Sequence, residues 1–304
     1  MKKYIILLIM CSAFFAKAQQ EPQYTQNQFN NNLEINPSYA GVFDDASMGL
    51  RYRNQWLGFD GAPTSIGLTG ESRIYKDRLG IGLSIINDKI GAINSTSADI
   101  NVSSHIRVSQ TGKIALGLKI GFDLIKSDFS LLTNIDPTDP LYQNTSASLF
   151  YQGLGALYYT DKMYIGISCP RILSFESSSI RTKISKPHYF LYGGYRIELD
   201  DGFELRPAVL SKYQAEAPFE VDFAMDVWFK QKLGFGASYR TNDAVTIMIK
   251  MNIQNLYIGY SYDMTVSGLR TLNTGTHEVY IGYTIGTKKS RSNIPDRNQN
   301  NRYF

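Results

Sequence analysis

The stretch from Lys113 to Leu124 reads Lys-Ile-Ala-Leu-Gly-Leu-Lys-Ile-Gly-Phe-Asp-Leu. One set of alternate positions holds only Ile, Leu and Phe, and the other holds Ala, Gly, Lys and Asp. Side chains of a β-strand point to opposite faces with a period of two. The stretch therefore predicts a strand with one wholly apolar face and one face of small or charged residues.

The same alternation returns along the chain from about residue 47 onward. Most of the segments that show it approach the roughly 9–11 residues with which a tilted strand crosses a bilayer. We expect strands at 48–56, 65–75, 79–86, 98–108, 113–124, 149–159, 162–168, 188–199, 203–211, 219–229, 233–240, 245–252, 256–263 and 278–285. The chain is therefore predicted to be all-β, with about 14 antiparallel strands.

A membrane barrel accounts for this pattern better than a soluble sandwich does. In a sandwich the apolar faces share one core and the polar faces meet water. Here the polar face holds Gly, Ser and mixed charges, which suits a crowded barrel interior, and charged residues are only 19% of the chain. Because only helices and closed barrels satisfy the backbone in lipid, we predict a transmembrane outer-membrane β-barrel over residues 47–287. The net charge of +4 is too small to indicate a nucleic-acid partner.

The expected connections alternate in length, as they do in outer-membrane barrels, where short periplasmic turns alternate with long outer loops. The tight set is 76–78, 109–112, 160–161, 200–202, 230–232 and 252–255. The long set is 57–64, 87–97, 125–148, 169–187, 212–218 and 264–276, and the short connection 241–243 breaks the pattern. An even number of strands places both termini of the chain on the periplasmic side.

Two groups of side chains follow from this model. Aromatic residues near strand ends are expected to form interfacial girdles: Trp56, Tyr75, Tyr158, Tyr159, Trp228, Tyr239 and Tyr262. Charges of both signs are expected inside, where burial requires them to pair: Arg51, Arg53, Glu71, Arg73, Asp99, Arg107, Lys119, Asp123, Arg196, Glu198, Glu204, Arg206, Glu220, Asp222, Asp226, Arg240, Lys250 and Asp263. Rings of a single sign, which would indicate a selective pore, are not evident.

The two ends of the chain differ from the barrel. Residues 1–18 have a basic start, a short apolar run and Ala16-Lys17-Ala18, which predict a signal peptide cleaved before Gln19 and hence export. Residues 19–46 are polar and form an N-terminal extension, either a plug in the barrel or a periplasmic arm. Residues 288–304 are expected to form a periplasmic C-terminal tail.

The sequence offers no site for catalysis, a cofactor or a metal. Cys169 is the only cysteine after the signal, so no internal disulfide is expected. A barrel-embedded hydrolase would need a serine and a third group beside a histidine. The nearest arrangement is Ser103-Ser104-His105, and the sequence indicates no third group. We therefore expect a protein that is not an enzyme.

Three motifs resemble the PorP/SprF family of type IX secretion system outer-membrane proteins. They are Gln23-Tyr24-Thr25-Gln26 with Phe29, Ile35 to Gly41 (Ile-Asn-Pro-Ser-Tyr-Ala-Gly), and Arg53 to Thr64 (Arg-Asn-Gln-Trp-Leu-Gly-Phe-Asp-Gly-Ala-Pro-Thr). Asn87-Asp88-Lys89-Ile90-Gly91 and the terminal Tyr303-Phe304 extend the likeness. The C-terminal tail departs from members that carry a cysteine near the end.

The resemblance implies a role in protein secretion or gliding motility in Bacteroidetes, at the cell outer membrane. Its implied partners are outer-membrane lipid, a secreted adhesin or other type IX cargo, and periplasmic ring or motor components. The motif residues are our candidates for partner binding: Asn36, Pro37, Tyr39, Gly41, Arg53, Gln55, Trp56, Gly58, Phe59, Gly61 and Pro63. The alternative is a transport barrel for small or apolar solutes, with the N-terminal extension as its hatch.

Overall fold

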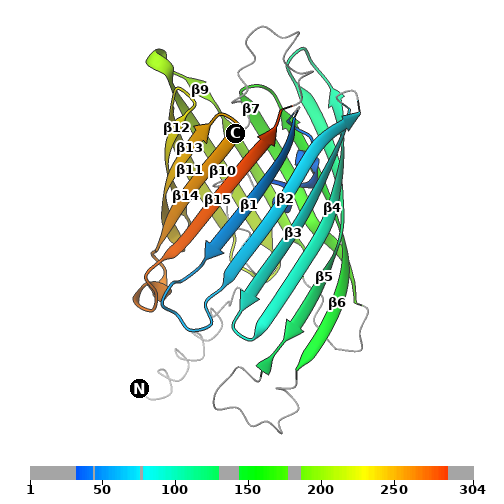
Figure 1. Cartoon of the computed structure of the whole chain (residues 1–304), viewed down its shortest axis with the longest axis vertical. Helices are drawn as coiled ribbons and strands as arrows, with labels where there is room; N and C mark the ends of the chain where they lie inside the picture. Colours follow the sequence, from blue (N-terminus) through cyan, green and yellow to red (C-terminus); the bar gives the residue numbers. More distant parts are fainter. Residues whose placement is uncertain (1–31, 44, 76–77, 130–143, 177–185, 287–304) are drawn as a thin grey trace, which may run out of the picture.

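The computed structural model describes residues 32–43, 45–75, 78–129, 144–176 and 186–286. There the strands form one twisted cylinder (Figure 1). The strands are β1 (Ala46–Asn54), β2 (Thr64–Tyr75), β3 (Leu79–Ile90), β4 (Ile93–Arg107), β5 (Lys113–Ser127), β6 (Thr145–Tyr159), β7 (Met163–Glu176), β8 (His188–Tyr195), β9 (Ile197–Glu198), β10 (Phe203–Gln214), β11 (Glu220–Phe229), β12 (Leu233–Arg240), β13 (Ala244–Ile253), β14 (Leu256–Thr265) and β15 (Thr276–Ile285). No helix in the described ranges is long and apolar enough to cross a membrane.

Every strand pairs antiparallel with its neighbours, and the sheet closes on itself. The first strand, β1, pairs with the last, β15, from Ala46 opposite Ile285 to Asn54 opposite His277. β8 and β9 both pair with the same edge of β10 and are separated by Arg196, so together they count as one strand of the wall. The predicted closed antiparallel barrel of 14 strands is thus confirmed.

The burial of side chains is inverted relative to a soluble protein. On β5 the apolar Leu116 and Ile120 are 51% and 55% exposed, whereas Lys119 and Asp123 are 3% and 2% exposed. The other strands repeat this arrangement, with apolar side chains on the outside and charged or small ones inside. A surface of this kind is stable only against lipid. The alternation in the sequence predicted these two faces correctly.

The two ends of the barrel differ in their connections. The tight turns that follow β2, β4, β6, β9, β11 and β13 lie at the upper end in Figure 1, together with the start of β1 and the end of β15. The loops at 55–63 and 266–275 lie at the lower end, along with the short connections between β3 and β4 and between β12 and β13. We call these the tight-turn end and the long-loop end. Short turns are periplasmic in such barrels, so the long-loop end is assigned to the cell exterior.

Several expected loops are instead strand. The expected loop at 87–97 is a tight hairpin, since β3 continues to Ile90 and β4 begins at Ile93. Similarly, β5 and β6 extend to Ser127 and from Thr145, β7 extends to Glu176, and β10 extends to Gln214. On β3 to β6, polar residues occupy the outward positions before the strands end, so the hydrophobic pattern placed these boundaries too early.

Two of the seven aromatic residues assigned to the girdles point inward. Trp228 and Tyr159 are 1% and 7% exposed. Both occupy the inward set of their strands, and Trp228 has the same parity as Asp222 and Asp226. Conversely, Arg107 and Glu198, which were expected inside, are exposed at the tight-turn end.

Candidate functional site

A segment that precedes the first strand lies inside the barrel. It consists of the single turn α2 (Asn32–Ile35), the 3₁₀ turn η2 (Pro37–Tyr39) and the residues up to Phe43. Residues 33–42 are buried, and they pack against the inner faces of β3 to β7. We call residues 33–43 the plug segment. Of the two alternatives for the N-terminal extension, this position favours the plug, whereas residues 19–31 lie outside the described ranges.

The local conformation of the plug segment follows from its sequence. Asn36 caps η2, because its side chain accepts hydrogen bonds from the Ser38 backbone N–H at 2.9 Å and the Ser38 hydroxyl at 2.6 Å. Pro37 occupies the first helical position, where its missing N–H costs nothing. Gly41 follows with a φ of +66°, a conformation that glycine adopts without strain.

Inward glycines of the wall make room for this backbone. A Cβ atom added to Gly80 on β3 would overlap the Ala40 carbonyl. One added to Gly117 on β5 would overlap the backbone of Pro37 and Ser38, and one added to Gly155 on β6 would overlap the Asn36 side chain. These three wall glycines therefore form a seat that fits the backbone of the plug segment.

Polar groups of the wall bind the backbone carbonyls of the plug segment. Lys119 donates to the Glu34 carbonyl at 3.1 Å, and Ser168 donates to the Ile35 carbonyl at 2.8 Å. Arg73 donates to the carbonyls of Gly41 and Val42, both at 2.7 Å. Buried carbonyls need such partners, and the wall supplies them as it would for part of its own core.

Ser103 and His105 hold one point of the plug segment. The Ser103 hydroxyl donates to the Ala40 carbonyl, and His105 Nε2 lies 2.9 Å from the same oxygen. A carbonyl only accepts, so Nε2 carries the proton and Nδ1 accepts from the Tyr159 hydroxyl at 2.9 Å. The serine and histidine singled out for a hydrolase are thus bound to the plug segment.

Two side chains of the plug segment reach across the lumen. Glu34 accepts hydrogen bonds from Arg51 Nη2 at 3.0 and 2.8 Å, and both side chains are buried. Asn36 Nδ2 donates to the Tyr192 hydroxyl at 2.7 Å and to the Ala156 carbonyl at 3.2 Å. These contacts attach the segment to β1, β6 and β8.

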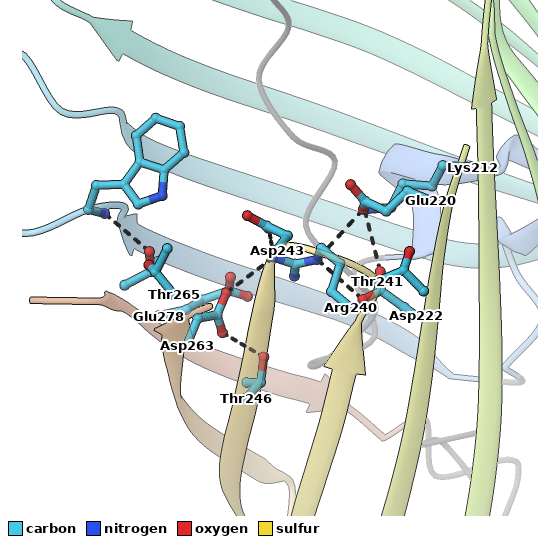
Figure 2. A network of polar contacts seen from close by, with 12 residues as sticks. Lys212, Glu220, Asp222, Arg240, Thr241, Asp243, Thr246, Asp263, Thr265 and Glu278 are labelled. Atoms are coloured by element: carbon cyan, nitrogen blue, oxygen red, sulfur yellow. Dashed lines mark hydrogen bonds and ion pairs between the residues drawn. The ribbon is translucent and has the colours of Figure 1, made fainter. Parts of the chain in front are cut away.

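The opposite side of the lumen holds a network of charges (Figure 2). Arg240 on β12 lies between Asp222 at 3.2 Å, Asp243 at 2.8 Å and Asp263 at 3.6 Å. Lys212 extends the network through Glu220 at 2.6 Å, and Arg53 extends it through Asp263 at 3.2 Å and Glu278 at 3.0 Å. The predicted pairing of inward charges is therefore observed here, and it links β10 to β1 at the long-loop end.

Aromatic side chains occupy a further part of the lumen, near the tight-turn end. Trp228 stacks on Tyr257 with ring centroids 6.5 Å apart, and Tyr257 meets Tyr280 edge-on at 5.7 Å. The Arg206 guanidinium lies 4.9 Å from the Trp228 ring. The plug segment, the charge network and this aromatic cluster together occupy three regions of the interior.

The candidate partner-binding residues separate into two groups. The interior group is Asn36, Pro37, Tyr39, Gly41, Arg53 and Gln55, all of which are buried. The loop group is Trp56, Gly58, Phe59, Gly61 and Pro63, which lie between β1 and β2 at the long-loop end. A partner outside the barrel can therefore reach only the loop group in this structure.

The loop at 55–63 is held by its neighbours. The Leu57 N–H donates to the Gly275 carbonyl, and the Leu57 carbonyl accepts from the Thr274 N–H, both at 2.8 Å. The Gly91 N–H donates to the Gly61 carbonyl at 2.9 Å. Phe59 nevertheless remains 46% exposed. The loop therefore presents an apolar side chain on an ordered support.

Several residues that build the interior lie outside the sequence motifs. Glu34, Lys212, Glu278 and the seat glycines Gly80, Gly117 and Gly155 were not among the candidates. The glycines did carry a signal, because each occupies an inward position of its strand. Among the described residues, no group of three His, Cys, Asp or Glu side chains could hold a metal ion.

The fold and the interior define the class of the protein: an outer-membrane β-barrel with an N-terminal segment seated in its lumen. A family model described as type IX secretion system membrane protein PorP/SprF matches residues 16–283. The chain belongs to this family, which has an outer-membrane role in type IX secretion.

Comparison with individual proteins gives only remote likenesses. No protein with a curated description matches the chain. Among solved structures, it is similar to the toluene transporter TbuX of Ralstonia pickettii, with 9% identity, a TM-score of 0.49, and coverage of 82% of this chain and 91% of that one. It is also similar to a FadL homologue of Pseudomonas aeruginosa, with 9% identity, a TM-score of 0.47, and coverage of 84% of this chain and 93% of that one. A third similar structure is Omp33 of Acinetobacter baumannii, with 8% identity, a TM-score of 0.48, and coverage of 81% of this chain and 100% of that one.

Proposed function

We propose that this barrel is a non-enzymatic component of the type IX secretion and gliding machinery that assists export or surface anchoring of adhesin-type proteins. The observation that carries the proposal is the occupied lumen. The plug segment is bound by residues of β1, β2, β4, β5, β6, β7 and β8, which is not the arrangement of an open channel.

Because the lumen is occupied, we expect cargo to contact the outside of the barrel. A secreted protein cannot pass through a lumen that holds the plug segment and the charge network. We therefore assign the contact to the long-loop end, where the loop at 55–63 is fixed by the loop at 266–275 and exposes Phe59. Binding residues are found disproportionately on loops that a rigid scaffold holds in place.

The opposite end suits the periplasmic partners that the family implies. The short turns assign the tight-turn end to the periplasm, and Arg107 and Glu198 are exposed there. We assign contacts with periplasmic ring or motor components to this end. Mass spectrometry of the mature N-terminus tests the export step, and we expect the first residue to be Gln19.

The test of the proposed function is deletion of the gene, followed by measurement of surface adhesin and of colony spreading. We expect both to fall, and we expect wild-type protein supplied from a plasmid to restore them. Unchanged secretion and motility in the deletion strain would rule out the proposal.

A transport barrel for small or apolar solutes requires the plug segment to leave its seat. Planar-bilayer conductance separates this alternative from the proposed function. We expect no stable conductance from the wild-type barrel and ion conductance from a variant that lacks residues 19–43. Conductance of the wild-type protein would instead favour transport.

A further inference from the structure

The outer surface of β3 to β6 changes character towards the long-loop end. The last wholly apolar row across these strands, aligned by backbone pairing, is Ile85, Ala98, Phe122 and Phe150. Two residues closer to the long-loop end on each strand, the row is Asn87, Thr96, Leu124 and Ser148. Two residues closer again, it is Lys89, Asn94, Lys126 and Ser146. All members of the last row are exposed on the outside of the barrel.

The position of the last row matches the polar layer of the outer leaflet. Four residues of a strand span about 13 Å, and the tilt of the strands shortens this along the bilayer normal. A polar headgroup layer of about 5–8 Å adjoins each side of the hydrocarbon core. The row that holds Lys89 and Lys126 therefore lies at or just beyond the lipid headgroups.

The two lysines are fixed relative to one another by the sheet. Asn94 separates them, so their backbones are two strand spacings, or about 10 Å, apart. Asn87 Nδ2 donates to Asn94 Oδ1 at 2.7 Å and to Thr96 Oγ1 at 2.8 Å, which orders the polar side chains beside them.

No carboxylate of the described part of the chain pairs with the lysines of this surface. Neither Lys89 nor Lys126 forms an ion pair with another described residue. The two polar rows contain no carboxylate; Asp88 belongs to the opposite face of β3, and Asp128 follows the end of β5 beyond the last row. Two cations on a lipid-facing wall at headgroup depth favour an anionic ligand in the membrane.

We propose that Lys89 and Lys126 bind the phosphate groups of an outer-leaflet lipid headgroup. The acyl chains of that lipid would lie along the apolar row below, beside Phe122 and Phe150, whose ring centroids are 6.5 Å apart. The site is thus continuous with the lipid-facing surface of the barrel. Asn94 and Ser146 are placed to donate hydrogen bonds to the same headgroup.

Native mass spectrometry of the full-length protein in detergent with added bisphosphorylated lipid A tests this site. We expect the Lys89→Gln/Lys126→Gln variant to bind the lipid about 30-fold more weakly, since each lysine near a membrane surface contributes roughly a fivefold effect. We also expect dephosphorylated lipid to bind wild type and variant equally. The control is Lys162→Gln/Lys230→Gln, which removes two exposed lysines at the tight-turn end and should leave binding unchanged.

Three outcomes would overturn the proposal. They are equal binding of phosphorylated lipid by wild type and the Lys89/Lys126 variant, an equal loss in the control variant, and displacement of the lipid by millimolar inorganic phosphate. The last outcome would assign the lysines to a soluble anion. Heat modifiability on gels checks that each variant is folded, and both lysines point away from the packed interior.

Discussion

Glu34, which precedes the barrel, accepts two hydrogen bonds from Arg51 of the first strand, and both side chains are buried. A buried carboxylate is tolerated only while its partners remain. This pair therefore links the position of the plug segment to the integrity of β1.

Loss of the arginine should release the plug segment. Arg51→Met removes both hydrogen bonds, and breaking one partner of a buried pair costs about 3–5 kcal/mol. Because the segment can avoid this cost by leaving its seat, we expect chymotrypsin to cleave the variant at Tyr39 while the wild-type protein resists. The control is Glu34→Gln/Arg51→Met, in which no charge is left buried and cleavage should decrease again. Equal cleavage of all three proteins would contradict the role of the pair.

The glycine seat gives a second prediction. Gly117→Ala places a methyl group against the backbone of Pro37 and Ser38, and overpacking of this kind costs about 1–3 kcal/mol. We expect faster cleavage of the plug segment at Tyr39 in an otherwise folded barrel. Gly70→Ala is the matched control, because its added Cβ would be 3.9 Å from the nearest atom. If both variants behave alike, the wall glycines do not define the seat.

The charge network should contribute to stability far more than exposed ion pairs do. Arg240→Met leaves Asp222 and Asp263 without a shared cation and should lower the free energy of unfolding by about 3–5 kcal/mol. Lys162→Met breaks a pair with Glu198 whose side chains are 54% and 51% exposed, and it should cost less than about 1 kcal/mol. Denaturant unfolding in detergent micelles measures both values, and similar losses would show that the network contributes no more than a surface pair.

The exposed loop residue should affect function without affecting stability. Phe59→Ser removes an apolar side chain that is 46% exposed, so we expect the unfolding midpoint to change little. In the deletion strain, this variant should restore less surface adhesin than wild-type protein does. Phe219→Ser, which changes a phenylalanine that is 61% exposed directly before β11 and outside the loop at 55–63, is the control and should restore normal levels. Full restoration by both variants would remove the loop at 55–63 from the proposed cargo contact.

The alternation of apolar and polar residues was sufficient to predict the barrel, because lipid imposes a strict two-sided pattern. It also indicated that Trp228 points inward, because Trp228 has the same parity as Asp222 and Asp226. Trp228 was nevertheless assigned to a girdle because it lies near a strand end. The polar pattern from Asn87 to Ser97 was assigned to a loop because polarity was taken as the end of the strand. In fact, the strands there continue beyond the apolar belt.

The plug seat could not be predicted in the same way. Asn36-Pro37 indicates a turn, but the turn chemistry does not reveal that Ala40 meets Gly80, Ser103 and His105. Such contacts join residues far apart in the chain and depend on the curvature of the closed wall. Only three-dimensional coordinates bring these residues together.

The pairing of β1 with β15 has a consequence for biogenesis. The two strands that close the barrel are the first and the last in the chain, so they can pair only after synthesis has finished. The plug segment directly precedes β1 in the chain and is therefore covalently attached to one of these two strands. During assembly in the outer membrane the wall must therefore close around the plug segment, and the pairing of β1 with β15 encloses it.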